Sequence, residues 1–124
     1  MAEIAATARE AASAGGIVPG SEAERQLLTM LIGRMSARCA IERVYLFGSR
    51  AHGIARISSD VDLLVVVPEE QATAEYWSTL LDVTAHGPVV VDVALSTPDE
   101  FAWRSLVPGF VEFDALQQGL LLYG

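Results

Sequence analysis

Two aspartates, Asp60 and Asp62, stand one residue apart at the start of an apolar run that ends at Val67. Side chains alternate along a strand, so the two carboxylates of an Asp-x-Asp pair point to the same side of it. Carboxylates held side by side repel each other, and a hard divalent cation such as Mg²⁺ relieves that repulsion through oxygen ligands. The pair therefore indicates a metal site, although two solvated acids at a loop–strand junction explain the pair alone equally well.

A third aspartate, Asp92, lies in the middle of the run Val89–Leu95, whose other members are all apolar. We expect a buried strand here, and aspartate is disfavoured in strands and costly to bury without a partner. If this strand lies beside the one that contains Asp62, Asp92 joins the first two carboxylates around a metal. The alternative is a structural ion pair between Asp92 and an arginine, either Arg50 or Arg56.

The dipeptide Gly48-Ser49 follows the β-prone run Arg43–Phe47. Glycine lets the backbone approach a ligand closely, and N–H groups at a helix start can hold phosphate oxygens together with a serine hydroxyl. We expect a brief helix and a loop over residues 50–57. An ordinary turn is the alternative interpretation of a glycine-serine pair taken alone.

The composition bounds the class of protein. With 124 residues the chain is long enough for one domain, and its 52% hydrophobic content supports a well-filled core. Its net charge is −8, and it contains no lysine. Such an acidic chain is not expected to bind nucleic acid directly through the phosphates, whereas a nucleotide held by metal ions is compatible with it.

Two further features bear on the location of the protein and its domains. Cys39 is the only cysteine, which excludes an internal disulfide and fits a cytoplasmic protein. The strongly apolar run Leu63–Val67 is too short to span a bilayer, so we expect no membrane association. Residues 1–20 are expected to form a separate N-terminal appendage that is flexible or docks on a partner. Residues 21–124 form the predicted domain.

Helices and strands alternate in the predicted domain. Ser21 with Glu24 three residues later is a capping box that starts the first helix. Hydrophobic periodicity places helices at 21–38, 72–85, 99–106 and 112–118, and strands at 43–47, 61–67, 89–95 and 120–123. This order predicts an α/β (α+β) fold, with a small mixed β-sheet flanked by helices and the last strand at an edge.

The segment FGSRAHGIARISSDVDLLVVV and the later VVVDVAL combine these features. A glycine-serine turn, ten residues, Asp-x-Asp and a third aspartate in a later strand resemble the signature of the polymerase-β-like nucleotidyltransferase superfamily. The chain looks most like its minimal nucleotidyltransferase (MNT) branch, the antitoxins of HEPN/MNT toxin–antitoxin pairs. The resemblance covers about residues 21–123. One departure is His52, where the family often has an arginine.

The resemblance implies a fold of the nucleotidyltransferase type and two Mg²⁺ ions between the carboxylates and the triphosphate of ATP. Asp60 and Asp62 would hold both ions. Asp92 would hold the catalytic ion and help to deprotonate the acceptor hydroxyl. Gly48 and Ser49 would anchor the β- and γ-phosphates.

Arg50 or Arg56 would neutralise phosphate charge in the same arrangement, and Arg56 has less support because it lies in the loop. The chain has no room for the helical domain that shapes the acceptor pocket in larger relatives. The resemblance therefore implies an acceptor presented by another subunit, with AMP transferred to a tyrosine of a HEPN toxin. Three alternatives remain: transfer to a small molecule such as an aminoglycoside, an antitoxin that acts by binding alone, and a structural module.

Overall fold

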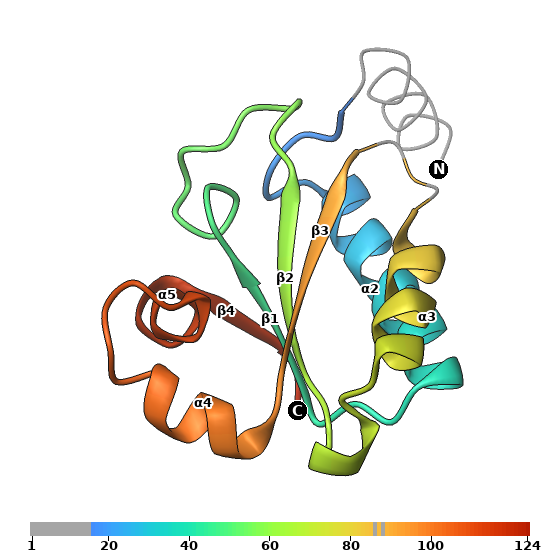
Figure 1. Ribbon diagram of the computed structural model, residues 1–124. Coiled ribbons are helices and arrows are strands. Elements are labelled where there is room, and N and C mark those ends of the chain that lie inside the picture. The colour runs from blue at the N-terminus through green and yellow to red at the C-terminus, as the bar shows by residue number, and fades with distance from the viewer. Residues whose placement is uncertain (1–15, 86, 88) are drawn as a thin grey trace.

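A four-stranded sheet with helices on both sides forms the framework of the chain (Figure 1). The structure is a computed structural model, and it describes residues 16–85, 87 and 89–124. In chain order the elements are α2 (Glu22–Arg38), β1 (Arg43–Phe47), β2 (Val61–Val66), the 3₁₀ helix η1 (Glu69–Gln71), α3 (Ala74–Thr84), β3 (Val91–Ser96), α4 (Pro98–Arg104), α5 (Val111–Gln118) and β4 (Leu120–Tyr123).

The strand order β3-β2-β1-β4 makes the sheet mixed. β1 runs antiparallel to both β2 and β4, whereas β2 and β3 are parallel. The parallel pair needs a crossover connection, and the segment that contains α3 provides it. The predicted mixed α/β fold is confirmed, and so are the edge position of the last strand and the adjacency of the two aspartate-bearing strands.

Each face of the sheet packs against its own pair of helices (Figure 1). α2 and α3 cover the face whose larger core contains Val44, Leu46, Val61, Leu63 and Val65. α4 and α5 cover the opposite face, whose smaller core consists of Tyr45, Leu64, Val66, Phe101 and Ala115. Side chains alternate along β2, so Asp62 lies on the same face as Leu64 and Val66. The carboxylate of Asp62 therefore belongs to the α4–α5 side of the sheet.

Hydroxyl side chains cap three of the helices. Ser21 Oγ accepts a hydrogen bond from the N–H of Glu24 at 3.1 Å, and Thr73 and Thr97 cap α3 and α4 in the same way. The capping box at Ser21 is only half formed, because the Glu24 carboxylate accepts its hydrogen bond from the N–H of Gly20 instead. No helix in the described part of the chain is long and apolar enough to cross a bilayer.

The segment after β1 forms consecutive turns, and the brief helix expected over residues 50–57 does not form within these described residues. The carbonyl of Gly48 accepts hydrogen bonds from the N–H groups of both Ala51 and His52, at 3.1 and 3.2 Å. Gly53 then adopts a φ of 75°, the left-handed conformation that ends helical geometry. Turns thus replace the predicted helix.

The N-terminal boundary of the domain also differs from the prediction. Ile17 is only 4% exposed and belongs to the larger core, and its N–H donates to the carbonyl of Ile57 at 2.9 Å. The start of the domain therefore includes residues 16–20, and the predicted boundary after residue 20 is too late. The remainder of the predicted appendage, residues 1–15, lies outside the described residues.

Candidate active site

Two of the three predicted carboxylates meet across the parallel strand pair. Asp62 on β2 is the register partner of Asp92 on β3. Because the strands are parallel and paired residue by residue, both side chains leave the same face of the sheet. Further along the same face, α4 and α5 cover Leu64, Val66 and Ser96 fully, and Ala94 is partly buried. The aspartates stand where that cover ends.

Asp92 is exposed, which corrects the prediction that its strand is buried. β3 is an edge strand, and only Val93 and Ser96 among its residues are buried. Asp92 is therefore not the buried acid that was predicted. Its expected place beside Asp62 is confirmed. Among the described residues Asp92 makes no ion pair with Arg50, which is paired with Glu24.

Asp60 immediately precedes β2 and is exposed, whereas Asp62 is half-buried. Burial raises the pKa of the Asp62 carboxyl above its ordinary value. The negative charges of Asp92, Asp60 and Asp114 raise the pKa further, as does a hydrogen bond with Asp92. The charges of three other carboxylates thus act on Asp62 at this end of the sheet.

Gly48 brings the backbone directly against Asp62. Its φ is 74°, and a methyl group added to Gly48 would overlap the Asp62 carboxylate. Only glycine satisfies both conditions at this position. The glycine-serine turn therefore lies beside the aspartates, as the spacing predicted. Ser49 is half-buried in the same turn, and its carbonyl accepts a hydrogen bond from Ile54 at 3.3 Å.

A fourth acid, Asp114 on α5, reaches the same turn. Its Oδ2 accepts a hydrogen bond from the N–H of Gly48 at 3.4 Å, and its Oδ1 lies 3.3 Å from Nε2 of His52. Nothing in the sequence predicts this contact, because Asp114 lies on a helix far along the chain and follows no motif. The contact could be predicted only once α5 is known to pack beside the strand that precedes Gly48.

Arg50 has a different environment from the one predicted. Its side chain is 0% exposed, and it pairs with Glu24 at 2.8 Å. The same guanidinium donates to the carbonyls of Ile17, Ile57 and Ser59. Its donors are directed into the protein, so the prediction that Arg50 contacts phosphate is wrong for this structure.

Comparisons with known proteins place the chain in a family and match its fold. The chain matches the family model described as polymerase beta, nucleotidyltransferase over residues 31–123, well over half of its length. The chain belongs to this family. It is also similar to the crystal structure of a candidate nucleotidyltransferase from Sulfolobus solfataricus, with 21% identity, a TM-score of 0.52 and coverage of 82% of this chain and 86% of that one. At that identity the similarity concerns the fold alone. No curated protein matches the chain.

Membership of the nucleotidyltransferase family supports nucleotidyl transfer as the general reaction and makes metal ligation the main question for the site. The donor set fits a hard cation, because the aspartates offer only carboxylate oxygens and share uncompensated negative charge. Among the described residues, however, no three His, Cys, Asp or Glu side chains are gathered closely enough to hold a metal ion as they stand. The carboxylate oxygens that a metal ion needs are therefore present, but the side chains are not arranged around one point.

Arg56 is the other predicted phosphate contact of this nucleotidyltransferase. It is exposed, and its backbone N–H donates to Ser59 Oγ at 2.8 Å. Its position in the loop between the glycine-serine turn and Asp60 leaves its side chain on the surface. The phosphate contact of Arg56 therefore stays a prediction.

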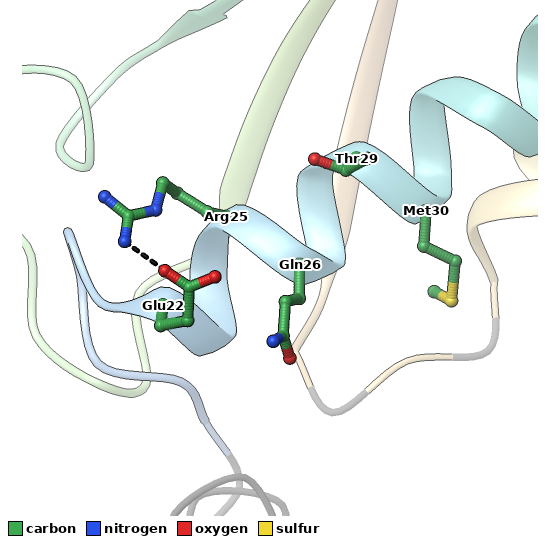
Figure 2. A pocket seen from close by; sticks show the side chains of 5 residues that line it. All are labelled: Glu22, Arg25, Gln26, Thr29 and Met30. Carbon is green, nitrogen blue, oxygen red and sulfur yellow. Dashed lines mark hydrogen bonds and ion pairs between the residues drawn. The ribbon is translucent and has the colours of Figure 1, made fainter. Parts of the chain in front are cut away.

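A shallow surface pocket lies on the other side of this nucleotidyltransferase, along α2. Figure 2 shows that its lining side chains all come from that one helix: Glu22, Arg25, Gln26, Thr29 and Met30. Glu22 and Arg25 form an ion pair with each other. Since α2 covers the face opposite to Asp62, this pocket is separate from the carboxylates.

Proposed function

We propose that this nucleotidyltransferase uses two Mg²⁺ ions to transfer AMP from ATP to a hydroxyl group of an acceptor. The observation that carries the proposal is the register of Asp62 with Asp92, directly beside the backbone of Gly48. This arrangement supports it because a cation held by the carboxylates would lie next to the N–H groups and hydroxyl that can bind phosphate.

Each residue then has a defined task. The bound metal ions supply charge compensation for the attacking and leaving oxygens. Asp60, Asp62 and Asp92 would hold them, and because the described residues present no ready three-ligand cluster, these side chains adjust when the ions bind. Ser49 Oγ and the Gly48 N–H bind the β- and γ-phosphates, and for this the Gly48 N–H exchanges its long 3.4 Å hydrogen bond to Asp114 Oδ2 for a phosphate oxygen.

The group transfer is balanced by one bond formed and one bond broken. The acceptor oxygen bonds to the α-phosphorus, and the bond from that phosphorus to the bridging oxygen breaks, releasing pyrophosphate. Asp92 accepts the proton of the acceptor hydroxyl, for which an exposed carboxylate at the edge strand is well placed. Arg56 compensates charge on the departing phosphates.

We further propose that the acceptor is a tyrosine of a HEPN toxin, for which this chain is the antitoxin. The support is the motif's resemblance to the MNT branch and the exposure of Asp60 and Asp92, which leaves the carboxylates open to a large acceptor. A protein acceptor can itself form the walls of the acceptor site around these exposed carboxylates.

The test is incubation of the chain with Mg²⁺, ATP labelled in the α-phosphate and a protein that co-purifies with the chain. Wild type is compared with Asp60→Ala/Asp62→Ala, and with Asp82→Ala as a matched control on α3, where the side chain is 70% exposed. Label on a partner tyrosine in wild type and in the control, but not in the double variant, is the expected result.

Two other outcomes would replace the proposal. Label that appears on an aminoglycoside and never on the partner would make the chain a small-molecule nucleotidyltransferase. Full neutralisation of the partner by the double variant, with no transfer by wild type, would make it an antitoxin that acts by binding alone.

A further inference from the structure

Arg50 joins two parts of the chain, the start of the domain and the loop before Asp60, which are also joined by the hydrogen bond from the Ile17 N–H to the Ile57 carbonyl. On one side its Nε and one terminal nitrogen donate to the carbonyl of Ser59 at 3.0 and 2.8 Å. That terminal nitrogen also donates to the carbonyl of Ile57 at 3.3 Å. These bonds fix the backbone immediately before Asp60.

The other side of the guanidinium is held by the start of the domain. Its second terminal nitrogen donates to the carbonyl of Ile17 at 2.9 Å and to Glu24 Oε2 at 2.8 Å. The remaining Glu24 oxygen accepts from the N–H of Gly20 at 3.1 Å. The side chains of Arg50 and Glu24 are 0% and 8% exposed, so the pair is shielded from water and from salt.

The hydrogen bonds of Arg50 distinguish the Arg50–Glu24 pair from an ion pair that only stabilises the core. Three of the five hydrogen bonds of the guanidinium go to carbonyls of the loop that leads into Asp60. Arg50 itself follows Ser49 directly, so one rigid planar group connects the glycine-serine turn to the aspartate loop. A lysine carries the same charge but lacks the fork needed to hold both carbonyls.

We infer that Arg50, oriented by Glu24, is a positioning residue that sets the distance between Asp60 and the phosphate-binding turn Gly48-Ser49. Arg50 touches no phosphate in this role; it acts through the backbone of Ser59. The inference rests on the proposed function in one respect, the use of Asp60 as a metal ligand.

The first experiment tests the positioning without any reaction. Backbone hydrogen exchange is compared between wild type, Arg50→Lys and Arg25→Lys, a matched control in the exposed Arg25–Glu22 pair of α2. In Arg50→Lys the amides of Ile17, Arg56 and Ser59, all hydrogen-bonded in or to this loop, should exchange at least about tenfold faster. Amides of α5 and all amides of the control should not change.

The second experiment measures the Mg²⁺ concentration that gives half-maximal AMP transfer. Arg50→Lys should raise it several-fold, and transfer should recover at high Mg²⁺, because Asp60 is misplaced but present. Glu24→Gln, which keeps the shape of the pair and loosens the guanidinium, should shift it in the same direction. Arg25→Lys should match wild type.

Three results would overturn the inference. If exchange became faster throughout the protein and the Mg²⁺ requirement did not change, Arg50 would stabilise the fold without positioning Asp60. A higher KM for ATP at every Mg²⁺ concentration, without faster exchange in the loop, would make Arg50 a phosphate ligand. Unchanged exchange in both Arg50→Lys and Glu24→Gln would remove the positioning role. A wild type that transfers no nucleotide contradicts the proposed function instead, and the exchange experiment still decides the role of Arg50.

Discussion

Asp62 and Asp92 are register partners across the parallel strands β2 and β3, and their carboxylates leave the same face of the sheet. Two acids in this relationship repel each other, and the raised pKa of Asp62 records both its burial and that repulsion. A purely structural sheet gains nothing from such a pair. The fold therefore maintains an unfavourable local charge at the position where a cation would make it favourable.

Asp62→Asn is expected to stabilise the metal-free protein while removing nucleotidyl transfer. The folded state disfavours ionised Asp62, so the stability that its protonated form contributes is fully present below the ordinary pKa of 3.8. This stability is lost as the pH rises through the raised pKa of Asp62 in the folded protein. At pH 7 the wild type bears this cost and asparagine does not, so thermal unfolding in EDTA should give the variant a higher Tm. That difference should shrink toward pH 3.

The control for this prediction is Asp82→Asn, because Asp82 is exposed and only 3.5 Å from an exposed arginine, Arg38. Its Tm should stay close to wild type at both pH values. Transfer by Asp62→Asn should fall by roughly 100-fold or more. A neutral-pH Tm below that of wild type would mean that Asp62 is stabilising and that the repulsion has been misjudged.

Removing the neighbours of Asp62 one at a time should lower its pKa in a defined order. Asp92 contributes most among the charges, followed by Asp60 and then Asp114. Asp92→Asn should therefore produce the largest decrease, which carboxyl-carbon NMR titration of Asp62 measures directly. A larger decrease in Asp114→Asn than in Asp92→Asn would show that α5, and not β3, supplies the main neighbour in solution.

Much of the site could be predicted from sequence because its geometry is local. The alternation of side chains in β2 and the fixed spacing from Gly48 to Asp60 follow from the chain itself. The adjacency of β2 and β3 required only one assumption, that two apolar runs separated by a helix pair in parallel. These features are confirmed by the register of Asp62 with Asp92.

The remainder depends on tertiary packing. Arg50 lies between two predicted site elements, yet the chain folds its guanidinium inward onto Glu24, a partner 26 residues earlier. Asp92 sits in an apolar run, but the run forms an edge strand and leaves the carboxylate exposed. Asp114, on α5, accepts a hydrogen bond from the N–H of Gly48, which lies 66 residues earlier in the chain. Local pattern carries no information on any of these three relationships.

Glu112 on α5 should matter for stability and not for transfer. It is 2% exposed, and Ser96 Oγ donates to its Oε2 at 2.8 Å, with Nη1 of Arg104 at 3.7 Å from the same oxygen. Glu112→Ala removes the carboxylate that accepts from Ser96 Oγ, while Arg104 keeps its ion pair with Glu100 at 3.0 Å, and the change should lower the free energy of unfolding by about 1–3 kcal/mol. Denaturant titration measures this loss, and Glu112→Gln, which retains an acceptor, should lose less.

Transfer by folded Glu112→Ala should remain close to wild type, because Ser96 lies at the opposite end of β3 from Asp92. A large fall in transfer with little loss of stability would instead connect this buried cluster to the carboxylates.

Gly48 and Gly53 offer a matched pair for testing the close approach of the turn to Asp62. Their φ angles are 74° and 75°, so alanine should cost each about 1–2 kcal/mol of backbone strain. At Gly53 an added methyl group meets nothing within 4 Å, whereas at Gly48 it overlaps the Asp62 carboxylate. Gly53→Ala should therefore lose stability only, and Gly48→Ala should also lose binding of Mg²⁺ and ATP.

Thermal unfolding and calorimetric titration with Mg²⁺ and ATP separate the two effects. Backbone strain is common to both variants, so a difference in nucleotide binding between them reports what the added methyl group displaces at Gly48, the Asp62 carboxylate first. Equal binding by the two variants would mean that the carboxylate moves aside without loss. The turn would then be required for its conformation, and its contact with Asp62 would have no part in holding the nucleotide.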